Sequence, residues 1–290
     1  MVRILIIVVV FSLTACKAKN NQVHSFFVAG HTYGNPMDKS HPEGLYKPFK
    51  DKFEFINNDK NIDLGFLLGD IVWTSKNPKY WDTALRDINT LEPDIYPVRG
   101  NHDGTLELFE SRFGKSYKTF VHKNNLYVLL DANRDDWSIS GEQLLFVRSE
   151  IEKYSMEVNN IFILTHQMIW WHKSMYPKPF PNSTYGKSPN SNYWSTIEPM
   201  LKQVNKPVYL FAGDVGAFSK EKRKAKRVIE YDYYNDGNLT YISTGMGGGV
   251  RDNFVIVDIE ADGKVSFRLI HLNGDDTNSL GKLTDNFKSN

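Results

Sequence analysis

Side chains that can bind a divalent metal ion follow four short apolar segments of this chain. They are Asp70, the group Asn101, His102 and Asp103, the lone His166, and Asp214. Carboxylate, carboxamide and imidazole groups without a thiolate suit manganese, iron or zinc, and the sequence does not choose among these metals. A lone histidine or a Gly-Asp pair after a strand is more often structural or part of a turn. Taken together and in this order, the four groups indicate a metal centre.

The apolar segments in front of these groups have the character of buried β-strands. Runs of this kind occupy residues 26–29, 64–68, 95–98, 126–130, 161–165 and 208–212. Stretches with helical spacing lie between most of them, and this alternation predicts an α/β fold with a substantial parallel sheet. Because open α/β sheets bind ligands beyond the carboxyl ends of their strands, we expect the metal-binding side chains to meet there. From residue 228 onward, short β-segments separated by turns predict hairpins.

The composition excludes several classes of protein. The chain has 290 residues, of which 41% are hydrophobic and 24% are charged, and its formal net charge is +1. Such a chain is neither disordered nor collagen-like, and it carries no signature of nucleic-acid binding. Its length fits one large α/β domain or two small ones with a large core. The single cysteine, Cys16, excludes an intrachain disulfide and a cysteine-rich metal site.

The amino-terminal segment resembles a bacterial lipoprotein signal peptide. Arg3 supplies a positive charge, residues 4–13 form an apolar run interrupted only by Ser12, and small residues lead to Cys16. This run is about half of the roughly 20 apolar residues that a spanning helix needs, which argues against a permanent transmembrane segment. The alternative is a short buried strand that ends in a core cysteine. We expect cleavage before Cys16 and acylation of its thiol.

These features divide the chain into four parts. They are a signal peptide at residues 1–15, the lipidated Cys16 with a tether at residues 16–24, a folded domain at residues 25–272 and a polar tail at residues 273–290. The lipid would anchor the domain to a membrane and hold it outside the cytoplasm, on the periplasmic face if the cell is Gram-negative. The membrane contact is then expected through the lipid, because the remaining charges balance.

The order of the metal-binding groups resembles the calcineurin-like metallophosphoesterase superfamily. Its signature runs D-x-H, G-D, G-N-H-[DE], a lone H after a strand, and G-H-x-H. The strongest part of the resemblance is Gly100-Asn101-His102-Asp103, about thirty residues after Gly69-Asp70. The resemblance covers about residues 25–272, and it implies a four-layer sandwich in which two mixed β-sheets are flanked by helices.

The resemblance also implies roles for these residues. Asp70 would bridge two divalent ions, and a metal-bound hydroxide would attack phosphorus. The ligands of one ion would be Asp70, Asn101, His166 and the side chain at position 214. His102 would neutralise a phosphoryl oxygen or protonate the leaving oxygen, and Asp103 would orient the His102 ring.

The first motif departs from the family pattern. In place of D-x-H-G-N, residues 31–35 read His-Thr-Tyr-Gly-Asn, which puts His31 at the aspartate position and Tyr33 at the histidine position. A second register keeps His31 as the histidine, but it puts Ala29 where the aspartate belongs. We prefer the first register because it retains the Gly-Asn turn and places the polar residue after the strand.

The last motif departs as well, and together the two changes weaken one metal position. Asp214 can replace an imidazole with a carboxylate oxygen, whereas Gly216 offers no side chain. One position therefore keeps Asp70, Asn101, His166 and Asp214. The other has only His31 and Asp70 as good ligands, and two ligands rarely hold an ion against solvent. We expect one ion rather than two, with Asp252 as a possible unrecognised ligand.

Three further side chains are candidates for contact with substrate, namely Tyr33, Arg251 and Trp170. Arg251 follows the glycine-rich residues 245–249 and would pair either with a phosphate or with a surface carboxylate. Trp170 opens a long aromatic segment and would either roof the site or pack the loop. The basic stretch at residues 220–227 is either a solvated turn or a lid that attracts anions.

The sequence thus predicts a metal-dependent phosphoesterase that hydrolyses a phosphomonoester or phosphodiester. Its expected substrate is a phosphorylated small molecule, glycan or lipid of the cell envelope. The alternative is a catalytically silent relative that binds an anionic glycan or a protein partner in the same cleft. A third possibility is a hydrolase of another bond that uses His31 and Asp214. A serine hydrolase is disfavoured because no G-x-S-x-G sequence is present.

Overall fold

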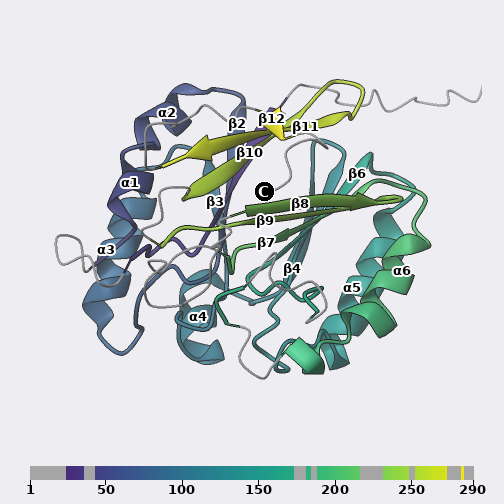
Figure 1. The fold of residues 1–290 in the computed structure, drawn as a ribbon, viewed down its shortest axis with the longest axis horizontal. Helices are drawn as coiled ribbons and strands as arrows, with labels where there is room; N and C mark the ends of the chain where they lie inside the picture. The colour runs from purple at the N-terminus through teal and green to yellow at the C-terminus, as the bar shows by residue number, and fades with distance from the viewer. Residues whose placement is uncertain are drawn as a thin grey trace, which may run out of the picture.

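Two β-sheets packed face to face form the centre of the protein. The structure, a computed structural model, describes residues 24–35, 43–172, 181–183, 188–215, 231–247, 252–272 and 282–283. Within them, two six-stranded sheets lie between helices on both outer sides (Figure 1). The expected α/β sandwich of two mixed sheets is therefore confirmed. The signal peptide, Cys16 and most of the expected tail lie outside the described residues.

The first sheet has the strand order β12-β11-β10-β1-β2-β3. Its strands are β1 (His24–Gly30), β2 (Ile62–Leu68), β3 (Asp94–Val98), β10 (Asn253–Ile259), β11 (Val265–His271) and β12 (Lys282–Leu283). Strands β1, β2 and β3 are parallel, whereas β10 runs antiparallel to β1 and forms the predicted hairpin with β11. The short β12 belongs to the expected tail, yet it pairs with β11.

The second sheet has the order β4-β5-β6-β7-β9-β8. Its strands are β4 (Lys118–His122), β5 (Asn125–Leu129), β6 (Asn160–Thr165), β7 (Val208–Ala212), β8 (Tyr231–Asp236) and β9 (Leu239–Thr244). Strands β5, β6, β7 and β9 are parallel, and antiparallel β4 and β8 close the two edges. The β8–β9 hairpin turns at Gly237, whose φ of 63° is easily adopted by glycine.

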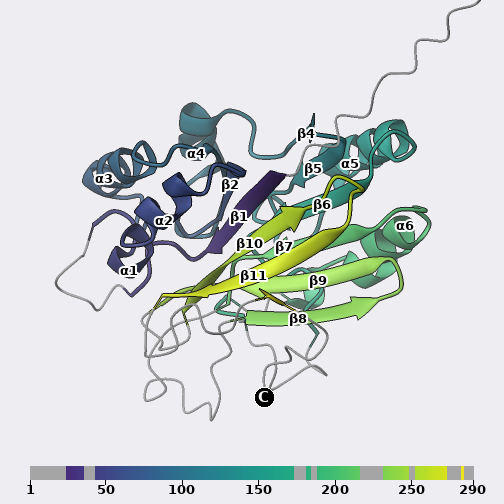
Figure 2. The same cartoon turned by 90° about the horizontal axis from the view of Figure 1, so that it is seen from above.

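Helices cover the outer face of each sheet (Figure 2). They are α1 (Lys47–Lys50), α2 (Phe53–Asn58), α3 (Pro78–Ile88), α4 (Leu106–Phe113), α5 (Gly141–Tyr154) and α6 (Glu198–Lys202), with the shorter η2 (Ser188–Asn190) and η3 (Tyr193–Ile197). Helices α1 to α3 share a buried cluster with the first sheet, and α5 and α6 share one with the second. No helix in the described part of the chain is long and apolar enough to cross a membrane.

Strand β1 shows why the core strands are apolar along their whole length. Phe26 and Val28 point into the cluster between the two sheets, whereas Phe27 and Ala29 point toward the helices. Because both faces of the strand are buried, an alternating polar pattern is impossible there. The Phe26 ring meets the Tyr127 ring edge to face, with centroids 5.4 Å apart, and this contact joins the two sheets.

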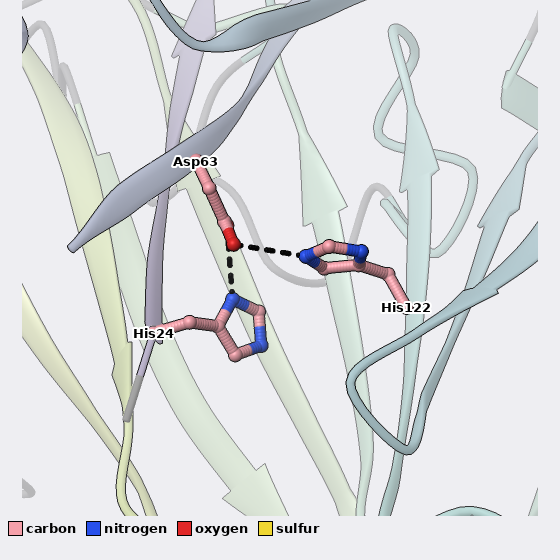
Figure 3. Close-up of side chains that lie close together, drawn as sticks. All are labelled: His24, Asp63 and His122. Atoms are coloured by element: carbon pink, nitrogen blue, oxygen red, sulfur yellow. Dashed lines mark hydrogen bonds and ion pairs between the residues drawn. The ribbon is translucent and has the colours of Figure 1, made fainter. Parts of the chain in front are cut away.

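A polar cluster joins the two sheets at the amino ends of β1 and β2 (Figure 3). Asp63 of β2 accepts hydrogen bonds from both neighbouring histidines, His24 Nδ1 at 3.1 Å and His122 Nε2 at 2.9 Å. Lys123 Nζ lies 2.5 Å from the same carboxylate. His24 and Asp63 belong to the first sheet and His122 to the second, so the cluster, which we name the inter-sheet clamp, ties the sheets together.

The inter-sheet clamp has the residue types of a metal site, but its hydrogen bonds favour an ion-pair network. The Lys123 ammonium group already forms an ion pair with the Asp63 carboxylate. The Asn125 amide is fixed because its Nδ2 donates to Lys123 O at 2.8 Å and its Oδ1 accepts from Asn160. The Asn125 nitrogen therefore faces His24 Nε2 at 3.4 Å. The proton of the His24 ring then sits on Nδ1, which donates it to Asp63. This nitrogen has no lone pair left for a metal.

We expect Asp63→Asn to lower the free energy of unfolding by about 1–3 kcal/mol at pH 7, because charge-assisted hydrogen bonds to a half-buried carboxylate are lost. Burial opposes ionisation, but the hydrogen bonds from His122, His24 and Lys123 hold the pKa of Asp63 well below its usual range. A depressed carboxyl pKa contributes stability above the unfolded-state pKa of about 4, and this stability is lost as the pH falls further.

Urea unfolding at pH 7 and at pH 3 tests this expectation. The difference between wild type and Asp63→Asn is expected to be larger at pH 7. Glu92→Gln is the control, because Glu92 pairs with Lys60 on the surface, where both side chains are more than half exposed. Equal midpoints for wild type and Asp63→Asn at pH 7 would contradict the assigned role of the clamp.

Candidate metal centre

The carboxyl ends of strands from both sheets meet at one edge of the sandwich, opposite the inter-sheet clamp. Asp70 follows β2, Asn101 and His102 follow β3, His166 follows β6, and Asp214 follows β7. The two sheets approach closely here, because a Cβ atom on Gly30 at the end of β1 would lie 2.3 Å from Gly213 Cα. A side chain at either glycine would force the sheets apart, so these two positions let both sheets contribute ligands.

His166 lies at the middle of the candidate ligands. Its Nε2 atom is 3.3 Å from Asp70 Oδ1, 3.2 Å from Asn101 Oδ1 and 3.7 Å from Asp214 Oδ1. Its Nδ1 atom lies 2.7 Å from Leu68 O, and a carbonyl can only accept, so Nδ1 carries a proton. In the neutral ring, the Nε2 lone pair then faces three oxygen acceptors without an intervening donor. Such a set of electron pairs requires a positive charge among them, which either a proton on Nε2 or a metal ion supplies.

The electrostatics of the site agree with this requirement. Burial alone would lower the pKa of His166, but the carboxylates of Asp70 and Asp214 outweigh it and raise the pKa to about 10. Burial and the nearby Asp70 charge raise the pKa of Asp214 to about 6. Asp214 Oδ1 is buried and has no hydrogen-bond partner. One divalent ion among these atoms would satisfy all of them, so the residues present fit a metal such as manganese, iron or zinc.

Asp103 holds the loop that carries Asp70. Its buried carboxylate accepts hydrogen bonds from four backbone N–H groups, those of Asp70, Ile71, Val72 and Gly100, at 2.7–3.2 Å. Asp70 has a φ of 53°, an unfavourable conformation for a residue with a side chain, and these bonds hold it there. The expectation that Asp103 orients the His102 ring is therefore wrong in this geometry, because the carboxylate is engaged by backbone donors.

The His102 ring is oriented by a backbone carbonyl instead. Its Nδ1 lies 2.7 Å from Trp73 O, and the backbone N–H of His102 donates to Asp70 Oδ1 at 3.0 Å. Because a carbonyl can only accept, the proton of the His102 ring sits on Nδ1. The hydrogen bond to Trp73 O therefore does not involve Nε2. His102 thus borders the Asp70 carboxylate with a fixed ring, as a proton donor or phosphoryl contact requires.

His31 and Tyr33 occupy the weaker half of the site. His31 Nε2 lies 3.6 Å from Asp70 Oδ2, so His31 is close enough to share an ion with that carboxylate. Burial lowers the pKa of His31 to about 4, which keeps the ring neutral at pH 7. Tyr33 is buried, and its ring centroid lies 4.2 Å from that of His31. The structure therefore places an aromatic ring beside His31.

Two residues of the aromatic segment at residues 170–194, neither of which the sequence analysis linked to the metal site, contact Asp214. Ser183 donates to Asp214 Oδ2 from both its backbone N–H and its hydroxyl, and the N–H of Asn182 donates to Asp214 O at 2.7 Å. The carboxamide of Asn182 is buried without a hydrogen-bond partner. These residues come from the aromatic segment, which has no periodicity, so no pattern in the sequence could have linked them to Asp214.

Two of the remaining sequence candidates have other partners, and the rest lie outside the described residues. Trp170 is fully buried and packs against the Tyr193 and Tyr241 rings, so of the two roles expected for it, it packs the loop. It has no exposed surface for substrate. Asp252 is buried, and its Oδ2 accepts the N–H of Gly247, so its carboxylate is engaged by the backbone. Arg251, Gly216 and the basic residues 220–227 lie outside the described residues.

One solved structure supports the fold, and a second is less similar. The purple acid phosphatase PPD1 from seeds of yellow lupin (Lupinus luteus) is similar, with a TM-score of 0.58 and 12% sequence identity over 91% of this chain and 53% of that chain. The chain thus spans about half the length of that phosphatase. The Thermus thermophilus protein TT1561 matches with a TM-score of 0.45 and 11% identity, over 85% of this chain and 98% of its own. At these identities the likeness to PPD1 shows the fold alone.

The sequence itself carries the family assignment. No curated protein matches the chain in sequence. The model of the calcineurin-like phosphoesterase family matches residues 23–218, which is more than half of the chain and includes Asp70, Asn101, His166 and Asp214. The superfamily expected from the order of the motifs is therefore confirmed. The chain belongs to the calcineurin-like phosphoesterase family.

Proposed function

We propose that this protein hydrolyses phosphoric esters with the help of a divalent metal ion. The observation that supports this most directly is the convergence of four acceptor atoms, from Asp70, Asn101, His166 and Asp214, at the carboxyl edge of the two sheets. Asp70, His166 and Asp214 are buried, and acceptor atoms of this kind are costly to bury without a positive charge. The family membership gives the bond type, a phosphoric ester.

We further propose one resident ion rather than two. Four oxygen and nitrogen ligands suffice for an ion with open positions for water and substrate. On the other side of Asp70, His31 is the one good ligand among the described residues. The ring beside it belongs to Tyr33, which is a poor ligand. A second ion there would have only His31 and the other oxygen of the Asp70 carboxylate, which is too few for tight binding.

The ion would lower the pKa of a bound water and neutralise charge on the phosphoryl oxygens. The chain's own residues would do the rest. His102, held by the Trp73 carbonyl, would contact a phosphoryl oxygen or transfer a proton to the leaving oxygen through Nε2. Asp103 would keep Asp70 and Gly100 in place through its backbone hydrogen bonds. Ser183 would hold Asp214 so that Oδ1 faces His166.

The substrate and its location are proposed from the sequence. The resemblance of residues 1–16 to a lipoprotein signal peptide supports a lipid anchor on Cys16 and a domain outside the cytoplasm, on the periplasmic face if the cell is Gram-negative. A phosphorylated small molecule, glycan or lipid of the envelope would then be within reach of the anchored domain. A phosphomonoester and a phosphodiester both remain suitable, because each presents phosphoryl oxygens to the ion and to His102.

A second candidate function is a silent binding protein for an anionic glycan or a protein partner. The observation in its favour is the incomplete half of the site, in which Tyr33 stands where the family pattern has a histidine. Such a protein would bind its ligand without turnover.

We expect the purified chain to contain about one manganese, iron or zinc ion. Asp70→Asn should lose both this ion and the hydrolysis of phosphoesters, because a carboxamide cannot replace the carboxylate charge. Metal analysis and turnover of generic phosphomonoesters and phosphodiesters check this. Asp94→Asn is the control, since Asp94 is exposed at the start of β3. A wild-type chain that binds the ion but hydrolyses no ester would favour the binding protein.

We expect His102→Ala to lower kcat on the order of 100- to 10,000-fold, as is typical for loss of a general acid. Metal content should stay at the wild-type value, because His102 Nδ1 bonds to a carbonyl and contributes no atom to the four-ligand set. Steady-state kinetics with metal analysis on the same preparation separate these effects. Loss of the ion in His102→Ala would show that His102 is a ligand.

We expect metal affinity to weaken as the pH falls. His166, with a pKa raised to about 10, is protonated at pH 7, so an ion must displace this proton to bind Nε2. Below this pKa, affinity should fall by about tenfold per pH unit from this proton alone. Calorimetry between pH 6 and pH 8, in buffers of different ionisation enthalpy, measures the affinity and the protons released. A constant affinity over this range would contradict the assignment of His166.

A further inference from the structure

Three aromatic side chains near Asp70 pack against one another, and we name this group, Tyr33, Trp73 and His102, the aromatic wall. The Trp73 and His102 rings stack with centroids 5.0 Å apart and an interplanar angle of 23°. The Tyr33 ring lies 5.2 Å from the His102 ring and 5.5 Å from the Trp73 ring. Each ring therefore supports the other two.

The aromatic wall is tied to the metal centre by the backbone of the same residues. His102 donates its N–H to Asp70 Oδ1 at 3.0 Å, and Tyr33 donates its N–H to Asp70 O at 3.1 Å. Trp73 follows Asp70 by three residues, and its carbonyl fixes the His102 ring. A group bound at His102 would therefore have the Trp73 indole as its neighbour.

Trp73 does not serve the hydrophobic core. It is 38% exposed, whereas Tyr33 is only 5% exposed, and it belongs to none of the buried clusters formed by the described residues. A single exposed tryptophan does not by its exposure alone indicate a binding site. Here, however, the indole is already stacked on the side chain that is proposed to meet the phosphoryl group, and part of its surface remains accessible.

We infer that the aromatic wall is a subsite for a planar aromatic ring carried by the phosphoester, with Trp73 as the stacking platform. This inference rests on the proposed function and adds the class of substrate. A ring joined to phosphorus through an ester oxygen, as an aryl ester or at the far end of a nucleoside, would lie against the indole while the phosphoryl group meets His102. Stacking on an indole is favourable for any flat π-system and requires no particular hydrogen bonds.

The half of the site with fewer ligands agrees with this assignment. Tyr33 takes the place of a family histidine, and its ring lies 4.2 Å from His31 and contacts the other two rings of the wall. The same substitution that removes a metal ligand therefore adds a buried aromatic side chain that supports the other two rings of the wall.

Matched pairs of non-hydrolysed phosphonates test the inference by binding, with the metal-loaded full chain in a calorimeter. Phenylphosphonate and cyclohexylphosphonate have similar size but differ in planarity. The phosphonate analogues of AMP and of ribose 5-phosphate differ only in the base. We expect the wild type to prefer the aromatic member of at least one pair by about tenfold, the size of one stacking interaction. The preferred pair tells an aryl ester from a nucleotide.

Trp73→Leu should abolish this preference, which is measured as the ratio of affinities within each pair, so that any loss of phosphoryl binding through the His102 ring affects both members equally. Trp73→Phe should keep part of the preference. Trp194→Leu is the matched control, since Trp194 is 41% exposed on η3, outside the wall. Equal binding within both pairs, or a preference that survives in Trp73→Leu, would overturn the subsite.

Failure of the subsite can be told apart from failure of the proposed function. If inorganic phosphate binds and glycerol 3-phosphate or its diesters are hydrolysed, but neither aromatic phosphonate is preferred, only the subsite is wrong. Tighter binding of the ribose 5-phosphate analogue than of phenylphosphonate, lost in Trp73→Leu, would identify a sugar platform and also overturn the aromatic ring. If no phosphate or phosphonate binds and no ester is hydrolysed, both proposals fail together.

Discussion

The buried Asp70 carboxylate is the interaction on which the rest of this edge of the protein depends. It lies between His166, His31 and the backbone N–H of His102, and it is only 2% exposed. Burial would raise its pKa, but the neighbouring histidines hold it well below the usual range. The carboxylate therefore stays ionised in a dry environment, where its attraction for a cation is much stronger than in water.

Keeping this charge in place requires support from several layers. Asp103 accepts four backbone hydrogen bonds and thereby fixes the strained turn that carries Asp70. The glycines at positions 30 and 213 allow the two sheets to approach each other, so ligands from both can meet. Ser183 fixes the orientation of Asp214 from outside the sheets. The metal centre is thus a property of the sandwich as a whole rather than of one loop.

The two ends of the sandwich use similar residue types for different purposes. At the amino ends of β1 and β2, a carboxylate is surrounded by two histidines and a lysine, and each of these three side chains donates a hydrogen bond to it. At the carboxyl ends, the corresponding atoms around His166 are all acceptors. The number of donors, more than the residue types, separates a structural ion-pair network from a site for a cation.

Much of this protein could be predicted from its sequence. The alternation of apolar segments with helical spacing determined the α/β class, because strands buried on both faces must be apolar throughout. The order of Asp70, Asn101, His102, His166 and Asp214 determined the family and the side chains that meet, because each follows a strand whose carboxyl end lies at the same edge. Only the tertiary structure decided that Asp103 holds a backbone loop, that Trp170 is buried and that Ser183 reaches Asp214. It also placed Trp73 on the His102 ring. These contacts join residues far apart in the chain or depend on ring orientation, and no local periodicity encodes either of them.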